Sequence, residues 1–188
     1  MNILGISCGH NANVCLVRDG ALVSHYEKER FTRVKDDAGN VDDLIRLLLD
    51  DHGLSLDEID LVASSWPVWP ERGVTGDLLD GVLYTSVFET STHTMRLLGR
   101  PLPALMIPHH LGHCAYAFHL SGFGDADIIA VDAGGNFTAS VVGHGSGSQV
   151  VIDHDLAPGS IGSLWSMASR DIFGDPLAAG KVMGLAPY

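Results

Sequence analysis

Histidines are concentrated in one short segment of the sequence. Four of the ten, His109, His110, His113 and His119, lie within eleven residues, where an even distribution would place about 0.6. On a helix, His109 and His113 share one face and their imidazoles can hold one cation, whereas His110 is turned about 100° away. A zinc-protease motif is disfavoured because it needs Glu at the position that His110 occupies. The spacing fits either a metal site or an ordinary solvated helix start.

Asp132 is the candidate for a third ligand. It ends the apolar run 127–132 and precedes Gly134 and Gly135. This order predicts a carboxylate at the carboxyl edge of a sheet, where ligands usually bind. The alternative is a solvated aspartate at a strand end, and spacing alone leaves both interpretations open.

Basic residues also cluster, although the chain as a whole is acidic. Four of the eleven lie within eight positions, at Lys28, Arg30, Arg33 and Lys35. Arg offers a planar fork of donors and Lys a point charge, so this group could bind a phosphate or a carboxylate. The alternative is a solvated surface on which these residues pair with the acidic residues between 27 and 37.

The segment Gly-His-Asn at 9–11 lies between two apolar runs and predicts a tight turn. Backbone amides and the side chains of His10 and Asn11 at such a turn suit an oxyanion or a phosphate. The same composition is typical of turns without a ligand. Neither a P-loop nor a dinucleotide-binding glycine pattern occurs in the sequence.

Composition narrows the class of protein. The chain has 188 residues, 46% of them hydrophobic, and a net charge of −12, which predicts a folded core and disfavours nucleic acid or an anionic membrane as partner. No apolar run approaches the roughly 18 residues that span a bilayer, and the N-terminus lacks the basic region of a signal peptide, so we expect a cytoplasmic protein. The three cysteines, Cys8, Cys15 and Cys114, predict free thiols.

The first half of the chain predicts an α/β arrangement. Strands are expected over 2–8, 12–18 and 21–27, with Asp19-Gly20 forming a hairpin turn. A helix is expected after Asn40 and before Gly53, with its apolar face formed by Val41, Leu44, Ile45, Leu48 and Leu49. A capping box over 55–58 and a buried strand over 59–64 should follow.

Further along, a loop is expected over 65–81 and a helical pattern over about 82–99. The remaining expected strands are 104–107, 127–132, 137–143 and 149–154, and the remaining expected helices are 109–120 and 160–173.

Six segments, taken in order, carry a resemblance to a known family. They are GISCGHNANVCLVRDG (5–20), ERFTRVK (29–35), HHLGH (109–113), SGFGDAD (121–127), DAGG (132–135) and GKVMGLAPY (180–188). Together they resemble the N-terminal part of the NodU/CmcH-type O-carbamoyltransferases, the family that includes the enzyme that carbamoylates tobramycin.

The resemblance implies an actin-like ATPase fold of the ASKHA and Kae1-like type. Residues 1–188 would form its N-terminal lobe, with a mixed sheet that starts in a β-hairpin and is flanked by helices. In this family a YrdC-like domain makes carbamoyl-adenylate from carbamoyl phosphate and ATP. The Kae1-like domain then passes the carbamoyl group to a hydroxyl of a small molecule, such as a sugar or an antibiotic.

The resemblance also assigns residues to roles. It implies that His109, His113 and Asp132 bind iron(II) or another divalent metal, together with an Asp from a second lobe. His10, Asn11 and His110 would lie beside the acyl group as catalytic residues. Cofactor-binding roles fall to Arg30, Arg33, Lys35 and Lys181.

The sequence departs from the family pattern in three ways. The usual D-G-x-G-E reads Asp132-Ala133-Gly134-Gly135-Asn136, and Asn13 stands where Ser is usual. The chain is also shorter than a full family member, so we expect it to lack the second-lobe Asp, most of the nucleotide site and the YrdC-like domain.

The alternative to an enzyme is a non-catalytic lobe that docks onto a complementary subunit, or onto itself, through an apolar surface around Val182, Met183, Leu185 and Tyr188.

Overall fold

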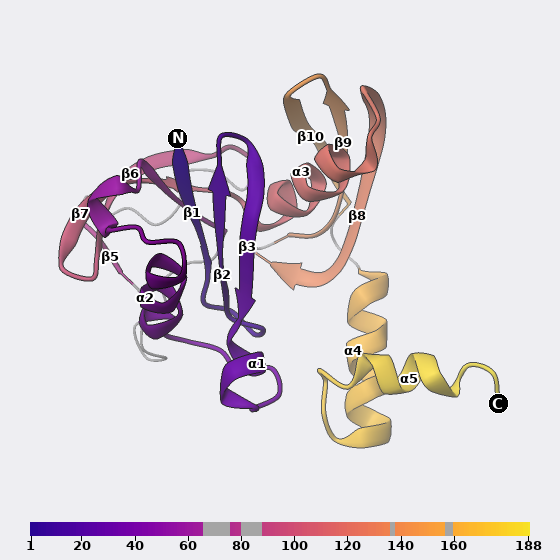
Figure 1. Cartoon of the computed structure of the whole chain (residues 1–188). Helices are drawn as coiled ribbons and strands as arrows, with labels where there is room; N and C mark the ends of the chain where they lie inside the picture. Colours follow the sequence, from indigo (N-terminus) through magenta and orange to yellow (C-terminus); the bar gives the residue numbers. More distant parts are fainter. Residues whose placement is uncertain (66–75, 80–87, 136–137, 157–159) are drawn as a thin grey trace. The chain divides into compact units, whose positions relative to one another are not determined.

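The computed structural model describes residues 1–65, 76–79, 88–135, 138–156 and 160–188. These residues form two compact units, Met1–Ile107 and Pro108–Tyr188. Each unit has its own sheet, with seven strands in the first and three in the second among the described residues (Figure 1). The predicted α/β class, with a mixed sheet that starts in a β-hairpin, is confirmed.

The first unit begins with an antiparallel meander. Strands β1 (Asn2–Ser7), β2 (Asn13–Arg18) and β3 (Ala21–Glu27) pair in sequence order. Asp19 and Gly20 have φ values of 51° and 83°, the two positive angles that a type I′ hairpin turn requires. The predicted hairpin is therefore confirmed, and Gly9-His10-Asn11 forms the predicted turn between β1 and β2.

The rest of this sheet combines parallel and antiparallel pairs. Strand β4 (Leu61–Ser64) pairs parallel to β1, and β7 (Arg100–Met106) pairs parallel to β4. Strands β6 (Ser91–Leu97) and β5 (Asp77–Leu78) continue it in antiparallel fashion, which gives the order β3-β2-β1-β4-β7-β6-β5.

The predicted helix over 82–99 is wrong where the structure describes it, because residues 91–97 form β6. Met95 and Leu97 are buried and alternate with exposed Thr94 and Arg96, which is the two-residue period of a strand. The hairpin to β7 turns at residues 98 and 99, whose φ values are both positive. The prediction of a loop over 65–81 is wrong at Asp77–Leu78, which forms β5. Residues 66–75 and 80–81 of this segment lie outside the described part.

Helix α2 (Asp42–Asp51) covers one face of this sheet, against β2 and β3 (Figure 1). Its five predicted apolar residues are all buried, so the predicted face is confirmed. The side chain of Asn40 accepts a hydrogen bond from the Asp42 amide at 2.9 Å, and Gly53 follows the helix with φ 59°. The capping box is present at the 3₁₀ turn η1 (Leu56–Glu58). A five-residue helix that was not predicted, α1 (Lys28–Thr32), follows β3.

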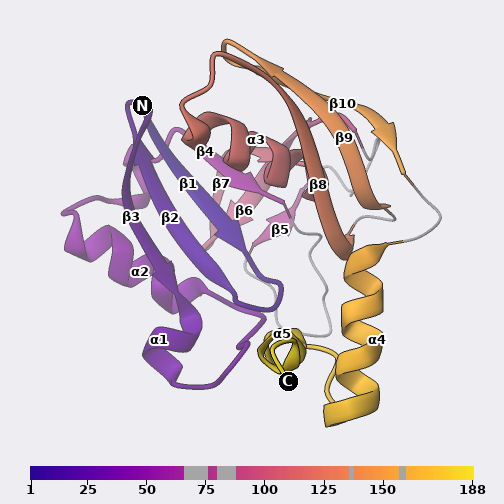
Figure 2. The same ribbon diagram turned by 90° about the vertical axis from the view of Figure 1, so that its right-hand side faces the viewer.

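The second unit packs one helix on a three-stranded antiparallel sheet. Helix α3 (His109–Ser121) lies against β8 (Asp125–Gly135), β9 (Thr138–Ser146) and β10 (Gln149–Asp155) (Figure 2). Helices α4 (Ile161–Phe173) and α5 (Ala179–Leu185) follow. All of these except α5 were predicted.

Helices α4 and α5 expose much of their apolar surface. The exposed apolar side chains on them are Ile161, Leu164, Trp165, Met167, Ile172, Phe173, Met183 and Leu185. Of the four residues predicted to form an apolar surface, Met183, Leu185 and Tyr188 are exposed and Val182 is partly buried. None of the helices in the described part combines the length and the apolar character needed to cross a membrane.

The buried core of the first unit predicts how its stability responds when a buried side chain is shortened. Leu48 is completely buried in the α2 face, so Leu48→Ala should lower the free energy of unfolding by about 2–5 kcal/mol through lost burial and an unfilled cavity. Arg46, on the exposed side of the same helix, is the control, and Arg46→Ala should change it by no more than about 0.5 kcal/mol. Urea unfolding followed by circular dichroism measures both, and equal midpoints would contradict the described core.

Candidate metal centre

Helix α3 places two histidines on adjacent turns. Pro108 lies directly before the helix with φ −54°, and its carbonyl accepts the first helical hydrogen bond from Gly112 at 2.9 Å. Proline is tolerated at the start of a helix because it has no backbone N–H that would be left without a partner there. His109 and His113 therefore point from the first two turns toward β8, where the structure brings them to Asp132.

The three predicted ligands meet through one atom each. His109 Nε2 lies 2.8 Å from Asp132 Oδ2 and 3.0 Å from His113 Nε2. His113 Nε2 lies 3.6 Å from the same carboxylate oxygen. The hydrogen bonds with His109 and His113 hold the pKa of the Asp132 carboxyl far below its usual value, so this group is ionised.

These separations are those of ligands around a single ion. Donor atoms about 2.1 Å from a metal are about 3.0 Å apart at right angles and about 3.4 Å apart in a tetrahedron. The observed 2.8, 3.0 and 3.6 Å bracket these values. Two imidazoles and one carboxylate on the same side of an ion are the donor set of non-haem iron(II) sites, which leave further positions open. The side chains present therefore fit a divalent transition metal.

Glycines allow the close approach of the elements around these ligands. A Cβ on Gly135 would lie 2.3–2.8 Å from the ring atoms of His109. A Cβ on Gly162, in the first turn of α4, would lie 2.4–2.6 Å from the backbone of Asp132 and Ala133. Both distances are too short for any side chain, so glycine at 135 lets the His109 ring lie against β8, and glycine at 162 lets α4 pack directly on the peptide of Asp132.

Two serines at the start of α4 hold the backbone on both sides of Ala133 by hydrogen bonds. Ser160, the N-cap of α4, donates its hydroxyl to the Asp132 carbonyl. Ser163 donates to the Ala133 carbonyl at 2.8 Å, and the Ala133 amide donates to Asp132 Oδ1 at 2.6 Å. The carboxylate is thus oriented from both sides before any ion binds, which is the arrangement that raises metal affinity.

His110 lies next to this cluster but points elsewhere. It is 1% exposed, and its Nδ1 is 2.5 Å from the hydroxyl of Thr138. Burial, with the nearby His109 as a second cause, lowers the pKa of His110, so its ring is neutral. Within the described residues its Nε2 is buried without a hydrogen-bond partner.

Two departures from the family pattern are accommodated locally. Ala133 replaces the usual glycine, and it is not among the described residues with positive φ, so alanine is unstrained there. Asn13 replaces the usual serine and donates its side-chain amide to the Asn11 carbonyl at 2.8 Å, which braces the turn between β1 and β2. The other residue that departs from the D-G-x-G-E pattern, Asn136, lies outside the described residues.

In the first unit, the predicted turn and the predicted basic cluster come together. His10 Nδ1 lies 3.0 Å from Asn11 Oδ1. The Asn11 amide is 3.3 Å from both Glu29 Oε2 and Asp36 Oδ1. Lys35 Nζ reaches the same two carboxylate oxygens, at 3.4 and 3.0 Å. One hydrogen-bonded network therefore joins the two motifs.

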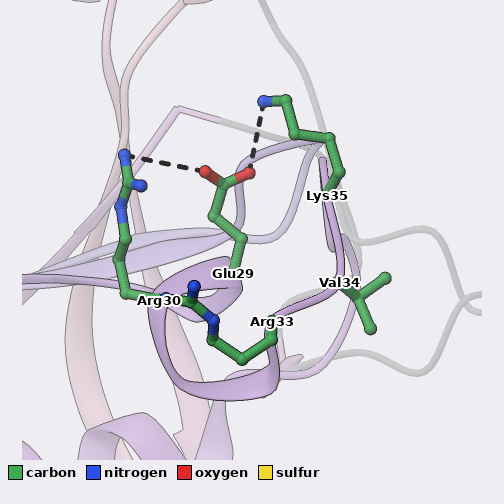
Figure 3. Close-up of a pocket in the computed structure, with 5 residues that line it drawn as sticks. All are labelled: Glu29, Arg30, Arg33, Val34 and Lys35. Atoms are coloured by element: carbon green, nitrogen blue, oxygen red, sulfur yellow. Dashed lines mark hydrogen bonds and ion pairs between the residues drawn. The ribbon is translucent and has the colours of Figure 1, made fainter.

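Arg30, Arg33 and Lys35 surround a pocket of about 170 Å³ together with Glu29 and Val34 (Figure 3). Figure 3 shows the side chains of Arg30 and Lys35 on either side of the Glu29 carboxylate, which binds both. The Lys35 side chain is 77% exposed, so it is available to an anion in solvent.

Two other basic residues of the sequence motifs lie elsewhere. Lys28 pairs with Asp37 at 3.1 Å and donates to the Ala38 carbonyl, so it supports the loop after α1. Lys181 is on α5 in the second unit, with its Nζ 5.6 Å from the ring centre of Phe173.

Comparison with protein families identifies what this chain is related to. It matches the family described as carbamoyltransferase N-terminus over residues 2–75 and 72–188, which is nearly its whole length. The chain belongs to this carbamoyltransferase N-terminal family. The resemblance of the sequence motifs is thereby confirmed at the level of the family.

The related proteins are much longer than this chain. The protein sll1178 of Synechocystis is 30% identical over 100% of this chain and 34% of its own length. The nodulation protein NolNO of Sinorhizobium fredii is 29% identical over 95% of this chain and 28% of its own length. Among solved structures, YeaZ from Pseudomonas aeruginosa aligns with 82% of this chain and 65% of its own, at 15% identity and a TM-score of 0.41. The chain thus spans about a third of the length of these two curated relatives.

The sequence analysis missed the residues that contact Asp132 and His110. Thr138, Gly162 and Ser163 are distant from the histidines in sequence, and no spacing rule connects them. Only Ser160 carried a signal, because serine before a helical segment predicts an N-cap.

The geometry predicts which histidines retain metal. The double variant His109→Ala, His113→Ala removes two of the three donor atoms, so it should retain no iron(II) after dialysis, by elemental analysis. His119→Ala, on the exposed side of the same helix, is the matched control and should retain as much as the parent. Equal iron in the double variant and the parent would show that this cluster is not the site.

The packing of α4 on Asp132 predicts a second effect on metal binding. Gly162→Ala forces the Asp132 peptide away from α4, and it should weaken metal affinity by about 10- to 100-fold. Gly180→Ala, in α5, places its Cβ where no atom lies within 4 Å, so its affinity should match the parent. Competition against a fluorescent chelator measures both, and an unchanged affinity in Gly162→Ala would contradict a supporting role for α4.

Proposed function

We propose that this chain forms the N-terminal, metal-binding part of an O-carbamoyltransferase. The reaction transfers a carbamoyl group from carbamoyl-adenylate to a hydroxyl of a small molecule, a sugar or an antibiotic. The observation that carries the proposal is the convergence of His109, His113 and Asp132 at ligand distances in a member of the carbamoyltransferase N-terminal family. Because the chain spans about a third of the length of these relatives, the complete activity is assigned to this chain together with a part equivalent to the rest of them.

In this proposal the two histidines and Asp132 hold iron(II) or another divalent cation. A bound cation supplies Lewis acidity toward a carbonyl or phosphate oxygen. The oxygen of the acceptor hydroxyl bonds to the carbamoyl carbon, the bond from that carbon to the adenylate oxygen breaks, and AMP leaves. The hydroxyl proton goes to a base, for which His110 and His10 are the candidates.

The pocket beside Lys35 is proposed to bind the phosphate groups of ATP or carbamoyl phosphate. Arg30, Arg33 and Lys35 supply positive charge and directional donors. Glu29 is only 11% exposed in its side chain and contacts two of them, so it keeps their side chains in place. Lys181, on α5 of the second unit, stays a predicted cofactor-binding residue of that unit.

The proposal is tested by product analysis. The chain is incubated with carbamoyl phosphate, ATP and iron(II), with and without the product of the neighbouring gene, and mass spectrometry follows AMP and carbamoylated hydroxyl compounds. We expect AMP that depends on carbamoyl phosphate when both polypeptides are present, and its loss in the His109→Ala, His113→Ala variant. No AMP in either mixture, or AMP that the double variant leaves unchanged, would contradict the proposal.

A non-catalytic docking lobe is the second candidate function. The observation that favours it is the set of eight exposed apolar side chains on α4 and α5, because contiguous exposed apolar surface marks interaction sites. In that case the chain would bind a complementary polypeptide equivalent to the remaining two thirds of its relatives. Formation of a stable complex in which the double histidine variant leaves product formation unchanged would favour this function over a catalytic one.

The anion pocket generates a prediction of its own. Lys35→Glu reverses an exposed charge beside Arg30 and Arg33, so it should abolish calorimetric binding of carbamoyl phosphate while leaving the chain folded. Arg46→Glu makes the same charge change on the exposed side of α2 and should bind as the parent does. Unchanged binding by Lys35→Glu would leave the cluster as a solvated charged surface.

A further inference from the structure

The side chain of Asn11 is held in one orientation by two carboxylates. Its amide nitrogen lies 3.3 Å from Glu29 Oε2 and 3.3 Å from Asp36 Oδ1, and it has two hydrogens, one for each oxygen. Hydrogen bonds from the Asp36 amide and from Lys35 hold the pKa values of Glu29 and Asp36, respectively, below their usual range, so both carboxylates can only accept. The reversed orientation would place the Asn11 amide oxygen against two negative oxygens. The oxygen therefore points the other way, toward His10.

This orientation decides which nitrogen of His10 carries a hydrogen. His10 Nδ1 lies 3.0 Å from Asn11 Oδ1, and an amide oxygen can only accept. The hydrogen bond forms only if Nδ1 donates, and this is true of the neutral and of the protonated ring. Nε2 is then the nitrogen that gains and loses the proton. The ring is exposed, and the Asp36 carboxylate is close enough for its charge to interact with that of the protonated ring.

The backbone keeps the turn that carries both residues in place. Asn11 has φ 58°, in the left-handed region that asparagine adopts more readily than most residues. The Ala12 amide donates to the Asp37 carbonyl at 2.9 Å, and the Gly39 amide donates to the Cys8 carbonyl at the same distance. The loop after α1 thus holds the turn on both sides.

We infer that Asn11 is a positioning residue, which keeps a hydrogen on His10 Nδ1 so that the exposed Nε2 can accept the proton of an acceptor hydroxyl. Both polar groups of the Asn11 side chain are bound within the chain, so it acts through His10 and not on the substrate. The resemblance, by contrast, implies a catalytic role for Asn11. The tautomer follows from the contacts alone.

The proton transfer rests on the proposed carbamoyl transfer. In that step the hydroxyl oxygen bonds to the carbamoyl carbon and its proton moves to His10 Nε2. The bond from the carbamoyl carbon to the adenylate oxygen breaks, and AMP leaves with its electron pair. The protonated ring keeps its Nδ1 hydrogen on Asn11 throughout and later releases the Nε2 proton to water.

Nuclear magnetic resonance of the chain labelled with ¹⁵N-histidine reads the tautomer directly. Long-range ¹H–¹⁵N correlations distinguish protonated from unprotonated ring nitrogens, and a His10→Gln variant assigns the signal. A histidine in water favours the Nε2–H tautomer, and His25, exposed on β3, is the internal reference for that state. We expect the ratio of Nδ1–H to Nε2–H to be about fivefold higher at His10 than at His25, the factor that one ordinary hydrogen bond provides.

Removal of the Asn11 amide should abolish this difference. Asn11→Gly keeps the positive φ without strain, so the His10 ratio should fall to that of His25. Asp19→Gly makes the same backbone change at the other turn of the meander, where φ is 51°, and should leave the His10 ratio as in the parent. Slow exchange of the Ala12 amide shows that a variant keeps its turn.

Two results would overturn the role of Asn11. One is a His10 ratio equal to that of His25 in the parent, which is measured in the unaltered chain and does not depend on how any variant folds. The other is a ratio like that of the parent in an Asn11→Gly variant that keeps its turn.

The mixture of both polypeptides with carbamoyl phosphate, ATP, iron(II) and glucose as the hydroxyl compound tests the proton transfer. His10→Gln should lower kcat for AMP formation about 100-fold or more. Asn11→Gly should lower kcat in proportion to the loss of the Nδ1–H tautomer, with an unchanged KM for carbamoyl phosphate.

The two parts of the inference fail separately. An unchanged kcat in Asn11→Gly, in which the tautomer has shifted, would overturn the proton transfer and leave the tautomer. Absence of AMP formation by the parent would remove the proton transfer together with the proposed function. The tautomer, which is measured in the free chain without turnover, would stand in both cases.

Discussion

The close packing of α4 on the peptide of Asp132 is the constraint on which the cluster of His109, His113 and Asp132 depends. A carboxylate at the end of a strand can rotate freely unless its backbone and one oxygen are held. Here Ser160 and Ser163 bind the two carbonyls that flank the Ala133 amide, and that amide binds Asp132 Oδ1. The other carboxylate oxygen, Oδ2, therefore points at His109. Helix α4 can lie this close to the Asp132 backbone only because residue 162 has no side chain.

The histidines are held by a different kind of contact. Helix α3 buries Leu111, Cys114 and Phe118 against its sheet, and a Cβ on Gly145 would lie within 2.7 Å of the Phe118 ring. Close packing of this kind leaves the helix little freedom to rotate or slide. The apolar face of α3 thereby sets the direction in which His109 leaves the opposite side. The three side chains of the cluster are held in place in two ways: the apolar core orients the histidines, and hydrogen bonds orient Asp132.

Much of this arrangement could be predicted from local sequence. The Asp19-Gly20 turn, the α2 face and the capping box each depend on residues close in sequence, and the ligand set depends on a helical period and one strand end. The helix predicted over residues 91–97 was wrong because Met95, Leu97 and Leu98 also fit a helical spacing. These residues form a strand because they pair with residues 100–106. Thr138 and Gly162 were not predictable, because their roles arise from contacts with segments 28 and 30 residues away in sequence.

His109 and His110 show why residue type and spacing do not define a role. They are adjacent, yet a rotation of about 100° turns one toward a carboxylate and the other toward a hydroxyl. Next to Asp132, His109 gains a charged partner that directs its Nε2 into the cluster. Next to Thr138, His110 gains a neutral partner at Nδ1, and its ring is buried. The helical spacing sets the angle between the two rings, and the residues on the neighbouring strands β8 and β9 determine which hydrogen bonds the ring nitrogens make.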